Sequence, residues 1–521
     1  MASVSLFMDN LSVFYLVLVI LWTCITVSCA GFLLLHHKTC ALLRVRNIPL
    51  SMAACALLHC YWVSVQLGYV VGPVMPEDAE YWIMGTWLPL GMGLFHGSNW
   101  RFLWVAAHQK RLLTEEPAWK QPKKSWWGKL NHTGRVFVVV GAGLAVQILV
   151  TVLMYIISRK WHSSWGIPGT QALGSTHDER MHDMARGWEW WPTVFWQCIW
   201  AWIVAPIILW RSRHIRDTQG WRVQTMGCCL ASLHATPMWL IALYVPAMEK
   251  VNQYFIPPQW IALSIMLIEI FTILLPCYET MRHRSQRSAT IANIGRWEPK
   301  EEDHYQSSDT TKSIVSSSKS SSGSMLSMGA LEHVLERNPT PLLQFSALRD
   351  FSGENIAFLT AVASWRDMLP GAGRRLSFNI AEKLVEDLNT NTDAVYSHFN
   401  RALRIYTDYI SPSADFQVNL PSTIFRRLHA VFETPARIID GEKQGADPST
   451  MWDTPRSMPS DGSEGVRVQY WGAIPADYDG GLFDEAEANI KYLVLTNTWP
   501  KFVKERRMSI ASGLSGEDAV N

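Results

Sequence analysis

Long apolar segments fill the first half of the chain and amphipathic segments fill the second. Seven segments of the first half carry no charged residue, or only one, over about the 20 residues that a helix needs to cross the ~30 Å hydrocarbon core of a bilayer. They are Val13–Leu35, Ile48–Val71, Tyr81–Trp100, Val136–Ser158, Trp190–Trp210, Val223–Met248 and Trp260–Tyr278. Core helices of a large soluble protein seldom stay uncharged over such lengths, so the pattern predicts seven transmembrane helices over residues 1–287.

The second half begins with a polar stretch that cannot bury a core. Eleven of the 21 residues in 307–327 are serine, and we predict a disordered linker over 288–324. From 325 to 508, apolar residues recur at the spacing of amphipathic helices, interrupted at 434–480 by a segment rich in Pro, Gly, Asp and Ser. The predicted fold class is therefore all-α: a seven-transmembrane bundle, then a soluble helical bundle with a long inserted loop at 434–480 and a disordered tail at 509–521.

The distribution of Lys and Arg predicts the orientation of the bundle. On one side of the predicted membrane, the connections (the third counted over 108–135) and the start of the tail together carry 17 Lys and Arg residues. The connections on the other side carry five. Because Lys and Arg are enriched in cytoplasmic loops, we expect an extracellular N-terminus and a cytosolic C-terminal half. The expected location is the plasma membrane.

Composition agrees with a membrane protein and excludes several other classes. Charged residues make up 17% of the chain, against roughly 25% in soluble proteins, and the 26 Trp residues are typical of chains with aromatic side chains at membrane interfaces. A net charge of +1 argues against a nucleic-acid partner. The sequence offers no cluster of metal-ligating residues, no phosphate-binding loop and no catalytic triad spacing, so we predict no cofactor, metal or catalytic residue.

One charged residue lies inside the predicted spans. Glu269 is nine residues past Trp260, near mid-depth of the last span. Intramembrane ionisable groups usually face a bundle interior or a watery cavity. We therefore consider Glu269, with His234 or His96, a candidate intramembrane site for a ligand, an ion or a proton. The alternative is that Glu269 only provides hydrogen bonds between helices.

Blocks of the soluble half resemble a regulator of G-protein signalling (RGS) domain. They are Leu331-Glu-His-Val-Leu335 with Asp350-Phe-Ser-Gly-Glu-Asn-Ile-Ala-Phe358, then Ala402-Leu-Arg-Ile-Tyr-Thr-Asp-Tyr-Ile410, Val418-Asn-Leu420 and Phe483-Asp-Glu-Ala486. The blocks stand in the order of that family across some 180 residues. The whole chain resembles the RGS-containing seven-transmembrane receptors of fungi and, in layout, of plants. Its spans lack the motifs of rhodopsin-like G-protein-coupled receptors.

The resemblance implies a GTPase activator that is not itself an enzyme. RGS domains hold the switch segments of a G-protein α subunit (Gα) in their transition-state arrangement, so that the Arg and Gln of Gα act on the γ-phosphate and the water. By resemblance, the Gα-binding residues are Asp350, Phe351, Glu354, Asn355, Asn419, Ser422, Leu493, Asn497 and Lys501. The implied partners are Gα, the lipid bilayer and an unknown extracellular ligand.

Two of these positions depart from the family pattern. The chain has Asn497 where most members have Asp, and Lys501 where they have Arg. Because Lys cannot form the bidentate fork of Arg, we expect weaker or partner-restricted GTPase activation. One alternative is a domain that binds Gα as a scaffold without accelerating hydrolysis. Another is a seven-span transporter or channel with a regulatory tail, which Glu269 and the histidines would suit.

Overall fold

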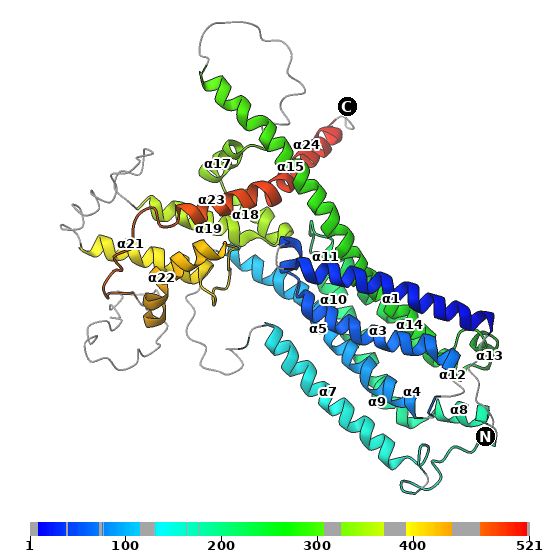
Figure 1. Ribbon diagram of the computed structural model, residues 1–521. Coiled ribbons are helices and arrows are strands. Elements are labelled where there is room, and N and C mark those ends of the chain that lie inside the picture. The colour runs from blue at the N-terminus through cyan, green and yellow to red at the C-terminus, as the bar shows by residue number, and fades with distance from the viewer. Residues whose placement is uncertain are drawn as a thin grey trace. The chain divides into compact units, whose positions relative to one another are not determined.

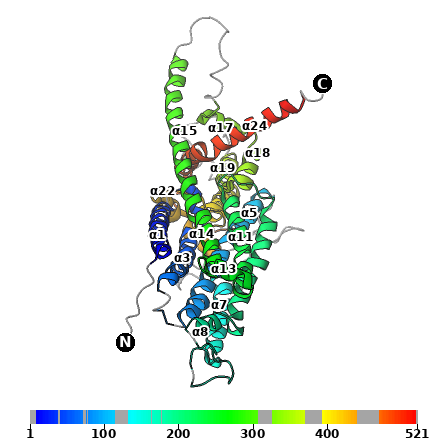
Figure 2. The same ribbon diagram turned by 90° about the vertical axis from the view of Figure 1, so that its right-hand side faces the viewer.

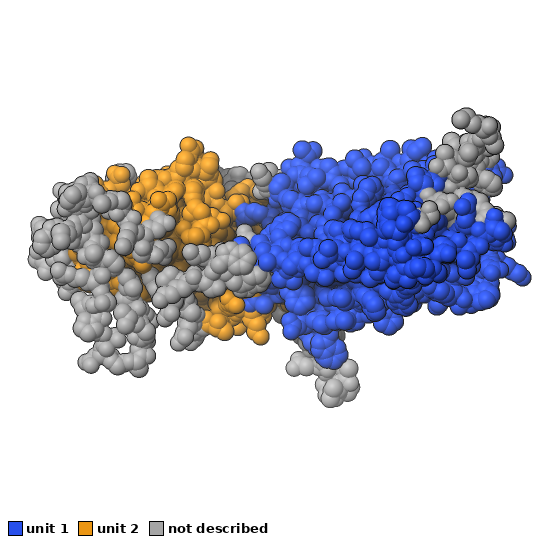
Figure 3. Space-filling model, turned by 90° about the horizontal axis from the view of Figure 1, so that it is seen from below, with its two compact units in different colours: residues 1–107, 123–284 blue, residues 108–122, 285–521 orange. Residues whose placement is uncertain are grey.

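The structure is a computed structural model that describes most of the 521 residues. The described ranges are 9–37, 40–71, 75–76, 78–114, 130, 132–162, 164–175, 177–306, 325–368, 392–439 and 469–517. Over these ranges the chain forms helices and connecting segments without a strand. It divides into two compact units (Figure 3): unit 1 comprises Met1–Ala107 and Lys123–Arg284, and unit 2 comprises His108–Pro122 and Ser285–Asn521.

Unit 1 is a bundle of long apolar helices joined by short helical turns (Figure 1). The first half of the bundle contains α1 (Asn10–His36), α2 (Ala41–Arg44), α3 (Ile48–Val71), α4 (Ala79–Trp82), η2 (Ile83–Trp87), α5 (Leu88–Lys110), η3 (Arg111–Leu113) and α7 (His132–Ile157). The second half contains α8 (His177–Met184), η4 (Trp188–Trp190), α9 (Trp191–Cys198), η5 (Ile199–Val204), α10 (Ala205–Ser212), α11 (Trp221–Leu233), α12 (Ala235–Tyr244), η6 (Pro246–Met248), α13 (Glu249–Asn252), α14 (Gln259–Glu269), η7 (Ile270–Leu274) and α15 (Leu275–Gln306). The last residues of α5, η3 and the second part of α15 belong to unit 2.

Six helical stretches are long and apolar enough to cross a membrane. They are Asn10–His36, Ile48–Val71, Thr133–Ile157, Trp188–Ser212, Trp221–Tyr244 and Gln259–Ala292. Six of the seven predicted spans are thereby confirmed as apolar membrane-length helices. The predicted third span, Tyr81–Trp100, is helical through α4, η2 and α5 but is not among the six, because its Gly, His and Asn residues lower its mean hydropathy.

The helices of unit 1 differ in how much of their surface the chain itself covers. α1 packs against α3, and α14 packs against both α3 and α11 (Figures 1 and 2). About half of α3 is buried inside the protein, whereas only 11% of the apolar window of α1 and 17% of that of α7 is buried. The remaining surface of α1 and α7 consists largely of exposed Val, Leu, Ile and Phe side chains. Such faces are suited to lipid rather than to water.

Unit 2 is a helical bundle around an aromatic core. Its elements are α17 (Met328–Arg337), α18 (Thr340–Phe345), η8 (Ser346–Asp350), α19 (Gly353–Arg366), α21 (Thr392–Ile405), η9 (Tyr406–Ile410), α22 (Ser422–Ile439), α23 (Asp484–Leu493), η11 (Val494–Thr498) and α24 (Trp499–Glu517). The buried core lies entirely between Leu331 and Trp499. At its centre, the ring of Phe483 stacks on Phe432 at 5.7 Å between centroids and meets Trp365 edge-on at 5.1 Å. A core contained within one stretch of chain indicates that segment 325–508 can fold by itself.

Two helices extend into segments that we predicted to be disordered. α15 continues through Gln306, so residues 288–306 are helical instead of belonging to the linker. α24 likewise continues through Glu517, into the predicted tail. Lengthening an existing helix avoids the nucleation cost that an isolated polar helix would meet, which the local composition does not reveal. Residues 307–324 of the linker and 518–521 of the tail lie outside the described residues.

The predicted inserted loop also begins later than its composition indicated. α22 contains Pro435 and continues through Ile439, past the predicted loop start at 434. Pro435 and Ala436 are buried, and Ala436 belongs to the core of unit 2, so packing outweighs the cost of proline within a helix. Of the remaining loop, 440–468 lies outside the described residues, and 469–480 contains turns and stretches without regular secondary structure that lead into α23.

A buried histidine makes the stability of unit 2 depend on pH. His398 on α21 stacks on Trp365 at 4.6 Å, and its Nδ1 lies 2.7 Å from the Tyr478 hydroxyl. Its Nε2 is buried and has no hydrogen-bond partner among the described residues. Burial lowers the pKa of His398 to about 4, so the ring is neutral in the folded domain at pH 7.

We predict that segment 325–508 loses stability as the pH falls from about 6.5 towards 4. The unfolded chain, in which His has a pKa of about 6.5, binds a proton in this window that the folded domain excludes. Urea unfolding should show that His398 accounts for a loss of about 1–2 kcal/mol between pH 7 and pH 5. His398→Gln should remove this part of the pH dependence, whereas the exposed control His333→Gln should retain it. The same pH dependence in wild type and His398→Gln would contradict the prediction.

Candidate functional site

The nine residues expected to bind Gα come from three segments of unit 2. Asp350, Phe351, Glu354 and Asn355 lie at the end of η8 and the start of α19. Asn419 precedes α22, and Ser422 is its first residue. Leu493 ends α23, Asn497 lies in η11 and Lys501 lies in the first turn of α24.

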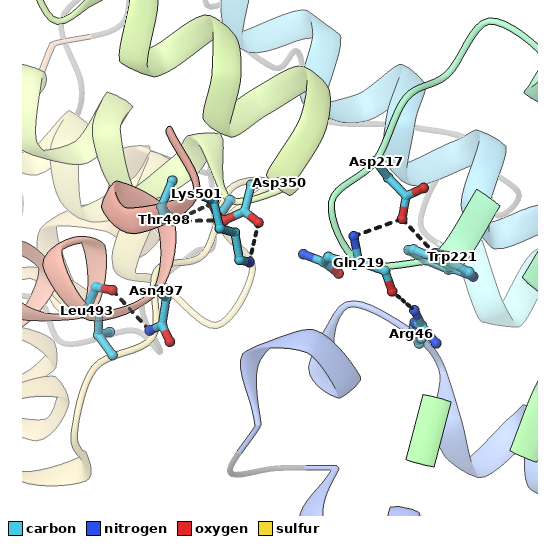
Figure 4. A network of polar contacts seen from close by, with 10 residues as sticks. Arg46, Asp217, Gln219, Trp221, Asp350, Leu493, Asn497, Thr498 and Lys501 are labelled. Carbon is cyan, nitrogen blue, oxygen red and sulfur yellow. Dashed lines mark hydrogen bonds and ion pairs between the residues drawn. The ribbon is translucent and has the colours of Figure 1, made fainter. Parts of the chain in front are cut away.

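Asp350 is the centre of a buried polar network (Figure 4). Its Oδ1 accepts a hydrogen bond from Lys501 Nζ at 2.6 Å, and its Oδ2 accepts one from Thr498 Oγ1 at 2.8 Å. The Ser352 hydroxyl also donates to Oδ2, at 3.0 Å, and lies 3.1 Å from the Thr498 hydroxyl. A buried carboxylate is tolerable only when its charge is paired and its oxygens have donors. The network therefore joins the end of η8 to η11 and α24.

The residue after Asp350 reverses the chain. Phe351 has a φ of 51° and lies in the left-handed region, which costs a residue with a side chain roughly 1 kcal/mol or more. Its ring is 1% exposed, and the next residue, Ser352, donates its backbone N–H to Ser346 O at 2.9 Å. Burial of the ring and the contacts of Asp350 hold this conformation. They determine where α19 begins and how its first turn is presented.

The first turn of α19 carries two of the expected Gα-binding side chains. Glu354 is buried, and within unit 2 its Oε2 accepts a hydrogen bond from Gln109 Nε2 at 2.8 Å, while Gln109 Oε1 accepts the Gly353 N–H at 3.1 Å. The Oδ1 of Asn355 is buried and has no hydrogen-bond partner among the described residues. An unsatisfied buried acceptor is rare enough to call for an explanation, and a donor supplied by a binding partner is one.

Gly353 is needed at the tight approach between η8 and α19. A Cβ at this position would lie 2.8 Å from Ala347 Cβ and 2.9 Å from Ala347 Cα. Because backbone cannot move aside as a flexible side chain can, a larger residue would displace the start of α19.

The second segment presents its polar side chains to solvent. Asn419 is exposed between Val418, which is buried, and Leu420, which packs on the core. Val418 donates its N–H to Tyr409 O at 2.8 Å, and the ring of Tyr409 meets Phe358 edge-on at 6.1 Å. Phe358 lies one turn after Asn355 on α19, so these contacts connect the Asn419 loop to α19. Ser422 is also exposed.

In the third segment, Asn497 is partly used by its own helix. Its Nδ2 donates to Leu493 O at 3.0 Å (Figure 4), and the Leu493 side chain packs on the core. The structure thus joins Asp350 directly to Lys501, and Asn497 to Leu493. No hydrogen bond among the described residues joins Asn419 to another of the nine.

The sequence reasoning missed Ser352 and Thr498 as parts of this site. Both hydroxyls donate to Asp350, and each lies next to a predicted residue, Phe351 or Asn497. Adjacency alone does not identify them, because Thr498 is 148 residues from Asp350. Recognising them requires knowing that η11 pairs with η8.

The candidate intramembrane residue, Glu269, has partners other than those expected. It is fully buried at the end of α14, where Oε1 lies 2.8 Å from Nδ1 of His59 on α3 and Oε2 accepts Nε1–H of Trp22 on α1 at 2.5 Å. His96 stacks on Trp200, and neither of its ring nitrogens has a hydrogen-bond partner among the described residues. His234 lies at the junction of α11 and α12. The structure therefore pairs Glu269 with His59 instead of His234 or His96.

A buried arginine of unit 1, Arg46, was not predicted as part of a site. Arg46 donates to Gln224 Oε1 at 2.8 Å. It also donates to the backbone oxygen of Gln219 at 2.6 Å (Figure 4). Asp217 accepts the backbone N–H groups of Gln219 and Trp221, at 3.2 and 2.7 Å. These contacts hold the start of α11 against the residues that precede α3.

Comparison with known proteins gives no match: no family model, no curated protein and no solved structure matches the chain. The functional interpretation therefore depends on the motifs and on the geometry described above.

We predict that Lys501→Met destabilises segment 325–508 by about 2–3 kcal/mol, because it leaves the buried Asp350 carboxylate without its cation. Lys501→Arg should retain most of the stability, since it keeps the charge. Urea unfolding at pH 7 measures the difference, with Lys504→Met on the exposed side of α24 as the matched control. A loss no greater than that of the control would show that the ion pair does not hold the site together.

Proposed function

We propose that the chain is an integral membrane regulator of heterotrimeric G-protein signalling. In this proposal, unit 2 is an RGS-like domain that binds Gα-GTP and accelerates GTP hydrolysis without catalytic residues of its own. The six apolar membrane-length helices support the membrane assignment. The motif blocks of the soluble half support the assignment of unit 2.

The observation that carries the proposal is the first turn of α19. Its position is determined by the buried Asp350 network, and it carries the Oδ1 of Asn355, which is buried and has no hydrogen-bond partner among the described residues. A GTPase activator of this type needs a rigid surface that stabilises mobile switch segments, since the hydrolytic groups belong to Gα. Asn355 offers a hydrogen-bond acceptor, and the exposed Asn419 amide offers both a donor and an acceptor.

The membrane arrangement belongs to the same proposal. The helix over α4, η2 and α5 would be the seventh span, with the N-terminus outside and unit 2 in the cytosol of a cell whose plasma membrane holds the protein. The excess of Lys and Arg in one set of connections supports this orientation. Tethering would raise the local concentration of the domain at the membrane, where Gα is anchored. The bundle would respond to an extracellular or membrane-borne signal.

A Gα scaffold that does not accelerate hydrolysis is a second candidate, favoured by two contacts. Lys501 is engaged by Asp350, and the amide nitrogen of Asn497 is engaged by Leu493 O. Both donors are therefore already used within the domain. Binding through Asn355 and Asn419 alone could hold Gα without ordering its switch segments fully.

We predict that the full-length chain in nanodiscs accelerates single-turnover GTP hydrolysis by a cognate member of a panel of Gα subunits. Asn355→Ala with Asn419→Ala should reduce the acceleration at least about tenfold, the effect of losing roughly 1.4 kcal/mol of transition-state stabilisation. Asn338→Ala, an exposed asparagine outside the nine residues, is the matched control.

The outcomes separate the candidates. Binding of Gα without acceleration would favour the scaffold. Acceleration that survives the double substitution would contradict the assigned surface. Neither binding nor acceleration with any Gα of the panel would contradict the proposed function.

A further inference from the structure

Three helices of unit 1 converge on the Glu269 carboxylate. Glu269 is on α14, His59 is on α3, and Trp22 and Thr23 are neighbours on α1. His59 uses both ring nitrogens: Nδ1 lies 2.8 Å from Glu269 Oε1, and Nε2 lies 3.0 Å from Thr23 Oγ1. Glu269 is 0% exposed and the His59 side chain is 15% exposed. The four side chains form a continuous hydrogen-bonded path from Trp22 through Glu269 and His59 to Thr23.

The contacts of Glu269 fit an ionised carboxylate when Nδ1 of His59 carries a proton. Trp Nε1–H can only donate, so Oε2 must accept, and a proton on His59 Nδ1 makes Oε1 an acceptor as well. An unpaired carboxylate in an apolar interior is costly, so the site needs a positive charge. His59, once protonated, supplies that charge at hydrogen-bond distance.

No other charged residue competes for this role on the elements that pack around Glu269. Within their bounds, α3, α12 and η7 contain no Asp, Glu, Lys or Arg, and the remaining ionisable groups of α1 and α11 near the helix ends are His36 and Arg222. The Glu269 carboxylate also interacts electrostatically with the buried thiol of Cys55 on α3, which carries no positive charge. The pair Glu269–His59 is thus electrically isolated within the bundle.

We propose that Glu269 and His59 form a proton-binding site inside the bundle, with His59 Nε2 as the exchanging atom. In the protonated state, Nε2–H donates to Thr23 Oγ1, and the imidazolium neutralises the carboxylate. When the Nε2–H bond breaks, the proton leaves, its bonding pair stays on Nε2, and the Thr23 hydroxyl turns to donate to that nitrogen. Both states fit the same heavy-atom positions, while the net charge of the pair changes from zero to minus one.

The proton therefore controls how firmly α14 is held to α1 and α3. With the proton bound, the carboxylate has a cation and two donors. Without it, a net negative charge remains between apolar helices, and the folded bundle is destabilised. This inference concerns unit 1 alone and does not depend on Gα binding by unit 2.

Thermal unfolding of the full-length chain in nanodiscs between pH 5.5 and 8.5 tests the proposal. His59→Gln, which has no cation beside Glu269 at any pH, should be less stable than wild type near pH 7. Its stability should rise as the pH falls further, because the isolated Glu269 carboxylate then takes up a proton. The gain can reach about tenfold in the folded-to-unfolded ratio per pH unit. The double variant His59→Gln with Glu269→Gln should lose this extra pH dependence, and the exposed control His182→Gln should keep the pH dependence of wild type.

A spectroscopic measurement keeps the test decisive if His59→Gln does not fold. Nitrogen-15 NMR of histidine-labelled protein at pH 6 should show an imidazolium signal that disappears in Glu269→Gln. Equal pH dependence of unfolding in His59→Gln and the double variant would overturn the proposal. So would a neutral His59 at pH 6 in the wild-type chain.

Discussion

A buried carboxylate, Asp350, determines the geometry on which the candidate site of unit 2 depends. Its two oxygens accept hydrogen bonds from Ser352 between η8 and α19, from Thr498 on η11 and from Lys501 on α24. Apolar packing brings these helices together but does not by itself fix their register. Directional hydrogen bonds to a desolvated charge fix the register, because any shift of one helix along another leaves a buried charge or donor unsatisfied. The reversed backbone at Phe351 and the presentation of Asn355 follow from that constraint.

Unit 1 uses the same physical device with a different cation. Glu269, like Asp350, has a hydrogen-bond partner on each oxygen, and both partners come from other helices. In unit 2 the partner of the carboxylate is the ammonium group of Lys501. In unit 1 the partner is the His59 imidazole, and we infer that proton binding to this ring controls how Glu269 is held. The chain thus contains one buried carboxylate, Asp350, paired with a lysine, and another, Glu269, whose pairing with a histidine we infer to depend on proton binding.

The sequence predicted the helices far better than the contacts between them. The bounds of α3, Ile48–Val71, coincide with the predicted span, because apolar length is a local property. Helix ends in polar segments were less predictable: α15, α22 and α24 continue into segments whose composition favours disorder or loop. Extension of an existing helix and packing on the core decide these ends, and neither is visible in local composition.

The same limit applies to the sites. Motif resemblance identified Asp350, Asn355 and Lys501 as candidates, but the pairing of Asp350 with Lys501 joins residues 151 positions apart. Glu269 was recognisable from the sequence as the one charged residue of the apolar spans. His59 was not recognisable as its partner, because the sequence of a helix does not determine which neighbouring helix a given side chain contacts. Ser352 and Thr498 were missed for the same reason.

The most direct measurement of the central claim is the affinity of the full-length chain for Gα in two nucleotide states. A surface that holds the switch segments in their transition-state arrangement must bind Gα carrying GDP and a transition-state analogue of the γ-phosphate more tightly than Gα carrying GDP alone. The account predicts a difference of at least about tenfold, abolished by Asn355→Ala. Equal affinity for both states, or a difference that survives Asn355→Ala, would contradict it.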